Sequence, residues 1–231
     1  MKIKKFLVVF LAAAIVWSIS ACGGKDKKEK KYSAYIENLI MANYLGASDE
    51  YIESTGANKK DAEAMYNANV DRLAKALRNY YGLGINEDDE LYADLQKLSG
   101  KIYGNIKYSV GAAYKKSGHY FVDISISPID IIAQTDADVR NYVADFNNRV
   151  SAGEFNNYEK EKYEHDFAEG IVDILLKAAD GMKYQEPVTV TVTILEEGDT
   201  FYISSDDLAR IDEVMVAGST FTDNTESSTS E

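Results

Sequence analysis

Apolar side chains recur every three or four positions in six stretches of the chain, and this spacing predicts six helices. In residues 59–81 the apolar positions form one stripe that includes Tyr66 and Val70. Gly82 follows this stretch, and a glycine just past the last turn commonly ends a helix. Ser, Thr and Asn side chains that can cap a helix start precede several of the stretches. The expected helices are residues 33–45, 59–81, 87–103, 136–150, 158–180 and 206–215, the last four following the caps Asn86, Thr135, Asn157 and Ser205.

Four other segments alternate apolar and polar positions, which is typical of strands buried on one face only. The cleanest is VTVTVTIL at 188–195, where the valines and Ile194 share one side and the threonines the other. Turns that contain Gly118 and Gly198 join the segments in pairs, which predicts two antiparallel hairpins. We expect the apolar face of the sheet to pack on helices and the polar face to meet water. The expected strands are residues 105–114, 119–127, 188–195 and 200–204.

This order of elements predicts an α+β fold, with an antiparallel sheet of about four strands packed by about six helices. A cone similar to the NTF2-like or cystatin-like folds is the alternative, although those folds place one helix against a longer sheet. The order helix, helix, hairpin occurs twice, at 59–127 and at 136–204. We expect residues 32–220 to form a single α+β domain. Two related halves within it are one interpretation of this repeated order, but residue identity between the halves is poor.

The first 22 residues have the layout of a secretory leader. Three lysines precede an apolar run over 6–17, which is shorter than the roughly 20 residues of a membrane-spanning helix. The sequence Ile19-Ser20-Ala21-Cys22 resembles the lipobox of bacterial lipoproteins, in which the leader is removed and the cysteine acylated, for example with palmitate. The resemblance implies a signal peptide over 1–21 and an anchor on Cys22. An ordinary signal peptide with a cysteine near its cleavage site is the alternative.

Charge divides the rest of the chain into a basic tether and an acidic body. The lipidated cysteine and a lysine-rich run make up residues 22–31, and the absence of apolar residues there predicts a solvated tether. The whole chain carries a formal charge of −13. Without the three leader lysines this becomes −16, and without the tether, which has five lysines and two acids, it becomes −19 for residues 32–231. Such a body is unsuited to nucleic acid, which requires a basic face. The polar, acidic tail over 221–231 is expected to be disordered.

No motif in the chain marks a catalytic or metal centre. The two histidines, His119 and His165, lie on different expected elements, and no HExxH sequence or cysteine pair accompanies them. No phosphate-binding loop, dinucleotide fingerprint or GxSxG elbow is present. The acidic runs at 86–90 and 136–138 are expected at helix starts, where carboxylates interact favourably with the helix dipole. We therefore expect no catalytic residue, no metal and no cofactor.

Tyrosine is the remaining compositional signal. There are 17 tyrosines against 8 phenylalanines, and the one tryptophan lies in the leader. A tyrosine buries its ring while its hydroxyl stays hydrated, which suits both a core close to solvent and a ligand groove. Packing in the core and at its rim is the plainer interpretation. A groove for a peptide or glycan is the alternative, and its candidate residues are Tyr80, Tyr81, Tyr108, Tyr114, Tyr120 and Tyr202.

These features favour a lipid-anchored protein that faces outside the cytoplasm and acts as a non-catalytic binding or protein-interaction module. Its expected partners are the bilayer, through acylated Cys22, and an envelope protein, peptide or glycan. The body resembles the small α+β domains of uncharacterised lipoproteins from Gram-positive bacteria. An envelope hydrolase that uses unmarked carboxylates is one alternative, and a structural accessory subunit of a surface complex is another.

Overall fold

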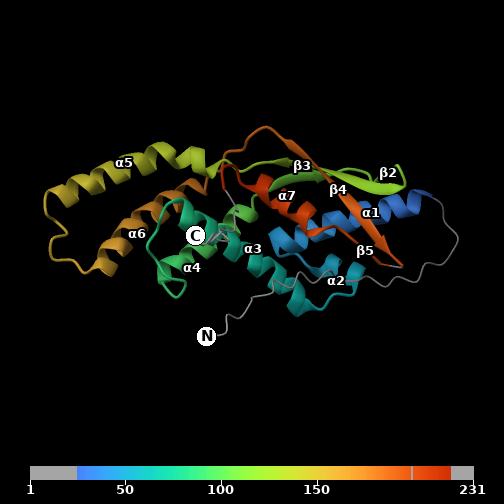
Figure 1. Cartoon of the computed structure of the whole chain (residues 1–231), viewed down its shortest axis with the longest axis horizontal. Coiled ribbons are helices and arrows are strands. Elements are labelled where there is room, and N and C mark those ends of the chain that lie inside the picture. The colour runs from blue at the N-terminus through green and yellow to red at the C-terminus, as the bar shows by residue number, and fades with distance from the viewer. Residues whose placement is uncertain (1–24, 199, 220–231) are drawn as a thin grey trace, which may run out of the picture.

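The computed structural model of this protein describes residues 25–198 and 200–219. The leader, Cys22 and the acidic tail lie outside the described residues, so the predictions for them stay predictions. The described chain is elongated, with a sheet at one end and a pair of long helices at the other (Figure 1).

The described elements confirm an α+β fold. The helices are α1 (Lys25–Ile40), the π-helical turn η1 (Met41–Leu45), α2 (Asp49–Thr55), α3 (Lys59–Tyr80), α4 (Glu90–Tyr103), α5 (Ile131–Ser151), α6 (Lys160–Ala178) and α7 (Ser205–Met215). The strands are β1 (Lys107–Val110), β2 (Tyr114–Lys116), β3 (His119–Ser127), β4 (Val188–Glu197) and β5 (Thr200–Tyr202).

The strands form one antiparallel sheet in the order β1-β3-β4-β5, and β2 pairs with β3 beyond the end of β1. The pairings of β2 with β3 and of β4 with β5 confirm the two expected hairpins. Ser117 and Gly118 make the first turn, and both have positive φ, 51° and 92°. A two-residue turn of this type matches the twist of the flanking strands.

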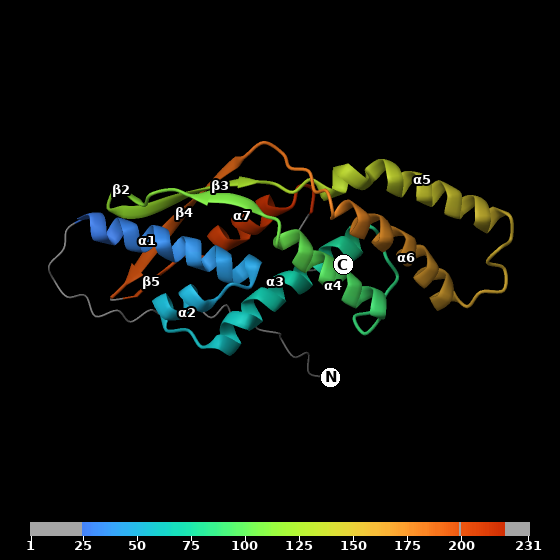
Figure 2. The ribbon, with the colours of Figure 1, turned by 180° about the vertical axis from the view of Figure 1, so that it is seen from behind.

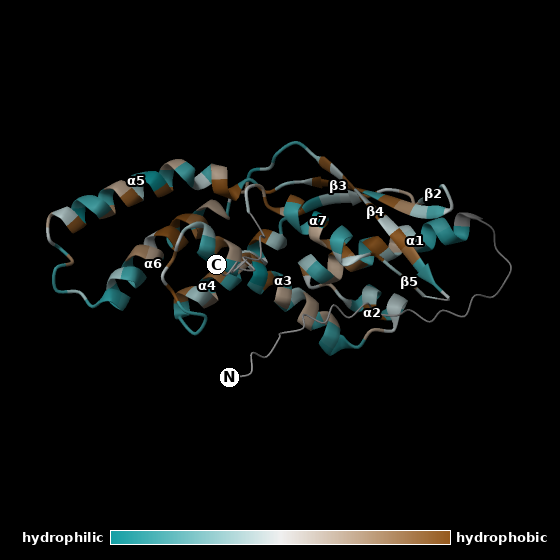
Figure 3. Ribbon diagram, viewed as in Figure 1, coloured by the Kyte–Doolittle hydropathy of each residue, from teal (hydrophilic) through white to brown (hydrophobic). Residues whose placement is uncertain are grey.

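One face of the sheet is buried and the other is polar, as the alternation predicts. On β3 the side chains of Val122, Ile124 and Ile126 are fully buried. Apolar and polar residues alternate along β3 and β4 in the ribbon coloured by hydropathy (Figure 3). Helices α1 and α7 contact the sheet (Figure 2). The opposite face carries serines, threonines and Asp123 of β3, which are only partly buried.

Helix α7 also covers an edge of the sheet. Beyond the short strand β5, the edge of β4 would leave backbone groups without partners. The Asp207 carboxylate accepts a hydrogen bond from the Thr193 amide at 2.9 Å, and Arg210 donates to the Thr191 carbonyl at 2.9 Å. An edge whose backbone is satisfied in this way is a poor template for pairing with another chain.

The single strand expected over 105–114 is interrupted. Val110 pairs with Ile124 and Tyr114 with Phe121, so three residues of one strand face two of β3. This extra residue is a bulge, and it moves later side chains to the other face. Tyr114 is consequently 38% exposed, on the face opposite to the one expected. A Cβ on Gly111 would lie 3.1 Å from the Asp123 carbonyl oxygen, a close contact that favours a glycine there.

Helix α1 begins at Lys25, whereas a solvated tether was expected through residue 31. Two interactions explain the early start. The Lys28 ammonium pairs with Glu196 of β4 at 2.8 Å. The Tyr32 ring packs against Tyr120 and Phe201 at centroid distances of 4.9 and 5.0 Å. A helix fixed at this point extends into the preceding lysines, which are good helix formers.

Helices α5 and α6 form an antiparallel arm at the end of the molecule away from the sheet (Figure 1). The inner turns of both helices belong to the main core, and an aromatic cluster holds the outer turns together. Phe146 of α5 is 1% exposed, and its ring lies 4.7 Å from Phe155 and 5.4 Å from Tyr163. Helix α6 contacts α4, which joins the arm to the body.

Candidate functional site

The six tyrosines singled out in the sequence are distributed over several parts of the structure. Tyr80 and Tyr81 contact each other at the end of α3, with ring centroids 4.9 Å apart. The Tyr81 hydroxyl lies 3.3 Å from Oγ1 of Thr135 in α5. Tyr114 lies on the outer face of the sheet, where its hydroxyl donates to Asp123 Oδ1 at 3.2 Å.

The other three tyrosines lie along the inner face and the edge of the sheet. Tyr120 is 5% exposed and belongs to the core. The Tyr108 hydroxyl donates to Glu37 of α1 at 2.9 Å, and its pairing with Ile126 places it far along β3 from Tyr120. Tyr202 lies on β5 and is partly buried. This distribution favours packing in the core and at its rim for these six rings.

A hollow of about 540 Å³ lies between α3 and α4. It is open to solvent, so it is a groove on the surface and not an enclosed small-molecule cavity. The lining combines an aromatic ring, a valine, two amides, a lysine and a glycine. The lining residues are Tyr66, Asn67, Val70, Gln96, Lys97 and Gly100.

A polar network beside the hollow fixes the orientation of Gln96. The Asp71 carboxylate accepts hydrogen bonds from the Tyr92 hydroxyl at 2.7 Å and from the Gln96 amide at 3.0 Å. Its other oxygen pairs with Lys75 at 2.8 Å. Burial raises the pKa of Asp71, but these hydrogen bonds outweigh burial and the pKa is lowered. Asp71 is therefore ionised at neutral pH and positions Gln96.

The lining of the hollow is suited to recognition. The Tyr66 ring offers a flat apolar surface, and the side chains of Asn67 and Gln96 each offer a donor and an acceptor. Lys97 adds a positive charge at the rim, although it also pairs with Asp94 at 2.8 Å. A polar ligand with one apolar face, such as a glycan or peptide segment, matches this set of groups.

A second polar cluster lies inside the body, where η1, α3, α4 and α7 meet. The side chain of Asp212 is 4% exposed and pairs with the Arg72 guanidinium at 2.7 Å. The Tyr44 hydroxyl donates to the same carboxylate oxygen. Burial raises the pKa of Asp212, and Arg72 and Tyr44 oppose this effect without cancelling it. The cluster thus ties α7 to α3 and η1 through one buried carboxylate.

The neighbours of this pair extend the network. The Tyr103 ring contacts Tyr44 at 5.3 Å, and the Tyr103 hydroxyl is buried close to the Arg72 guanidinium. Burial raises the pKa of Tyr103, and the charge of Asp212 raises it further. The Asn69 amide donates to the Asn43 carbonyl at 3.0 Å. These contacts fix how four helical elements pack, which is a structural role.

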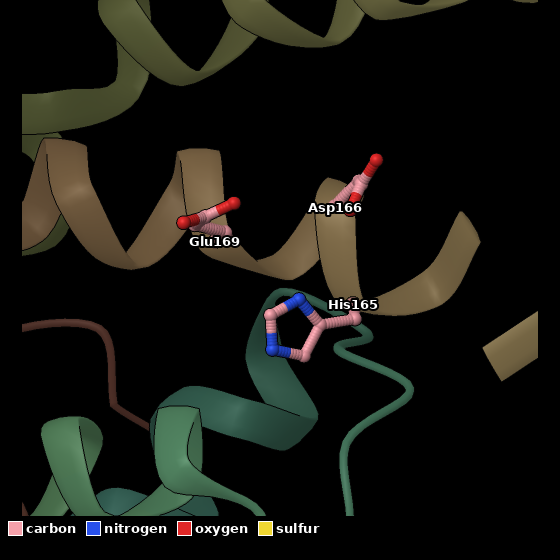
Figure 4. A group of neighbouring side chains, drawn as sticks. All are labelled: His165, Asp166 and Glu169. Carbon is pink, nitrogen blue, oxygen red and sulfur yellow. The ribbon is translucent and has the colours of Figure 1, made fainter. Parts of the chain in front are cut away.

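His165, Asp166 and Glu169 of α6 form a potential metal-ligating group, with one ligand atom of each within 4.8 Å of the others. The His165 ring is directed toward the segment before α4, whereas Asp166 points away from that segment (Figure 4). His165 Nε2 lies 3.8 Å from Asp89, and Asp166 pairs with Lys162 at 3.2 Å. Other partners thus compete for two of the three ligands, and the prediction that the protein needs no metal stays a prediction.

Within residues 25–198 and 200–219, no helix has both the length and the apolar character to cross a bilayer. Cys22 and the sequence that resembles a lipobox precede these residues.

Comparisons with known proteins give one likeness of fold. No protein-family model and no curated protein sequence matches the chain. Its fold is similar to the crystal structure of ycdA from Bacillus subtilis, a protein provisionally described as a lipoprotein, with a TM-score of 0.56 and 13% identity. The match covers 82% of this chain and 57% of that chain, so this chain spans little more than half of the other's length. At this identity the likeness establishes a shared fold only.

Proposed function

We propose that this protein is a membrane-anchored extracytoplasmic lipoprotein whose body is a non-catalytic binding module. The lining of the hollow between α3 and α4 carries the proposal for the body, because its ring, amides and ammonium group are groups that recognise a ligand. Two observations support the anchor: the lipobox sequence that ends at Cys22, and a fold shared with a Bacillus subtilis protein provisionally described as a lipoprotein.

The expected ligand is a polar peptide or glycan of the cell envelope. Stacking on Tyr66 and hydrogen bonds to the Gln96 amide together require a ligand with both an apolar face and polar groups. Because the Asp71 carboxylate holds that amide in place, little side-chain entropy is lost when a ligand binds.

Capture of envelope material by the intact protein tests the hollow. Tyr66→Ala and Gln96→Ala should each weaken capture by about 5- to 30-fold, equivalent to about 1–2 kcal/mol for a moderate contact residue. Tyr80→Ala is the matched control, since Tyr80 lies on the same helix, is 52% exposed and is not in the lining. An equal loss in all three variants would exclude the hollow as the recognition surface. Turnover of a captured peptide or glycan that a single acidic residue abolishes would favour the hydrolase instead.

Replacement of Cys22 tests the anchor. Cys22→Ala should leave the leader uncut at that site or release the protein to the medium, because no thiol remains to take an acyl chain. Cell fractionation with the wild type as reference measures the outcome. A variant that has lost its leader and still fractionates with the membrane would contradict lipid anchoring.

The arm formed by α5 and α6 favours a second candidate, a structural accessory subunit of a surface complex. The arm has its own aromatic cluster around Phe146 and projects from the body, so it offers two long helical surfaces to a partner protein. Removal of the outer turns of α5 and α6 around Phe146, which lies outside the main core, would then abolish assembly while leaving capture at the hollow intact.

A further inference from the structure

The end of the molecule nearest the leader carries a local excess of positive charge, here called the basic end. Two elements far apart in the sequence supply its lysines. The first turns of α1 lie beside the hairpin of β2 and β3 at one extremity of the molecule (Figures 1 and 2). The lysines are Lys27, Lys28, Lys30 and Lys31 from α1, and Lys115 and Lys116 from β2.

Contacts with one ring place these two elements together. The ammonium groups of Lys28 and Lys115 lie 5.8 and 5.2 Å from the centroid of the Tyr120 ring. Both lysines also act on Glu196 of β4. Burial raises the pKa of Glu196, but a hydrogen bond from Lys28 and the charge of Lys115 contribute to a net lowering of that pKa. These contacts place Lys28 and Lys115 on one surface, and the other four lysines lie on the same two elements at this end of the molecule.

The basic end is unusual in this acidic chain. It has six lysines but only three acidic residues among those whose side chains the structure describes at this end. The three acids are Glu29, Glu196 and Glu197. The arm at the opposite end contains ten acids and five bases between residues 131 and 178, a net charge of −5. The molecule is thus charged asymmetrically along its long axis, positive where the leader joins it and negative at the arm.

Cys22 lies close in the sequence to the basic end. Only three residue steps separate Cys22 from Lys25, the first residue of α1. That segment reaches about 10 Å when fully extended, at roughly 3.3–3.6 Å per residue. An acylated Cys22 would therefore hold the basic end within about one Debye length of the bilayer surface, about 8 Å at physiological salt.

We propose that the basic end is a docking surface for the headgroups of anionic phospholipids, which holds the body upright with the arm directed away from the membrane. The inference rests on the proposed lipid anchor for its setting. The acyl chains provide retention, and the lysines provide orientation, since each lysine near an anionic surface strengthens binding severalfold. The carboxylates of the arm are repelled by the same surface.

Binding of an unacylated protein to vesicles tests whether the basic end itself recognises anionic lipids. The probe is the mature chain from residue 22 with Cys22→Ser, mixed with vesicles of pure phosphatidylcholine or of phosphatidylcholine containing phosphatidylglycerol. Lys115→Glu combined with Lys116→Glu should weaken binding to the anionic vesicles by about 20-fold or more. Lys160→Glu combined with Lys162→Glu is the control, since it makes the same charge change on exposed residues of the arm. The control pair should retain wild-type binding.

Three results would overturn the proposal: equal binding to both kinds of vesicle, wild-type binding by the Lys115/Lys116 variant, or an equal loss in the control. Thermal melts of each variant verify folding. If the Lys115/Lys116 variant fails to fold, Lys27→Glu combined with Lys30→Glu on α1 should give the same loss. Release of the Cys22→Ala protein from cells would report on the anchor separately, so failure of the anchor and failure of the docking surface are distinguishable.

Discussion

Asp212 illustrates how a single residue can decide the packing of several helices. Its carboxylate is almost completely buried and is held by Arg72 and Tyr44, which come from two other elements. A buried ion pair gives little net stability compared with an apolar replacement, but loss of one partner leaves a buried charge uncompensated. The pair therefore acts mainly to select one arrangement of α3, η1 and α7.

Removal of the positive partner should be costly. Arg72→Met keeps much of the side-chain volume but leaves the Asp212 carboxylate without its guanidinium, which is expected to cost about 3–5 kcal/mol of unfolding free energy. Denaturation in urea measures the loss. Asp206→Asn on the exposed side of α7 is the control and should cost no more than about 1 kcal/mol, the usual contribution of a carboxylate in the first turn of a helix. A small effect of Arg72→Met would mean that Asp212 is protonated in the folded protein.

The residues that line the hollow could not be identified from the spacing of apolar residues in the sequence. The spacing of apolar residues places Tyr66 and Val70 on the stripe expected to face the core. Both are only partly buried, because α4 does not cover this part of α3 completely. Gln96 lies about 30 positions away and carries no motif. Its role as a lining residue follows from the hydrogen bond to Asp71, which no pattern in the sequence indicates.

At the scale of elements, some helices of the structure begin or end at other residues than the sequence predicts. Thr135 was expected to cap a helix, but α5 begins at Ile131 and the Thr135 hydroxyl donates to the Ile131 carbonyl at 2.8 Å, within the helix. The short helix α2 was not expected, since its seven residues are too few to show an apolar period. The core-facing positions of β3 and most of those of β4 were predicted correctly, because period two fixes which side chains share a face.

The two faces of β4 should respond differently to a charge. Val190→Asp would bury an unpaired carboxylate on the inner face, where Val190 is 5% exposed, at a cost of several kcal/mol. Thr189→Asp, on the exposed outer face, should cost much less, and unfolding in denaturant compares the two. Thr191 is unsuitable as the control because its hydroxyl donates to Asp123 at 2.7 Å, so a second carboxylate there would be repelled. Equal losses would mean that both faces of the sheet are buried.

At the scale of the whole molecule, the inner turns of the arm share the main core with the sheet, whereas its outer turns have an aromatic cluster of their own. Phe146 and Phe155 are buried against aromatic neighbours within the arm, away from the main core. Regions with their own small core commonly open independently of the global unfolding reaction. The arm is therefore expected to be the less stable end of the molecule.

Hydrogen exchange can separate the two ends. Phe146→Ala should remove about 3–5 kcal/mol of local packing and lower amide protection in the outer turns of α5 and α6. Protection in β3 and β4 should remain unchanged. Ile124→Ala is the reference variant, since Ile124 is fully buried under the sheet and its loss should lower protection throughout the body. A uniform loss of protection in Phe146→Ala would mean that the arm and body unfold together.

The sequence by itself determined the α+β class, both hairpins and most of the helices, because each depends on spacings of two to four residues and on turn residues nearby. It also showed the acidity of the body and the resemblance of Ile19-Ser20-Ala21-Cys22 to a lipobox. Only the tertiary structure decided that α1 continues through Lys28 toward the leader, that Tyr66 and Gln96 share a hollow, and that Lys115 joins the lysines of α1. These features depend on contacts between residues 30 to about 170 positions apart, which no local period encodes.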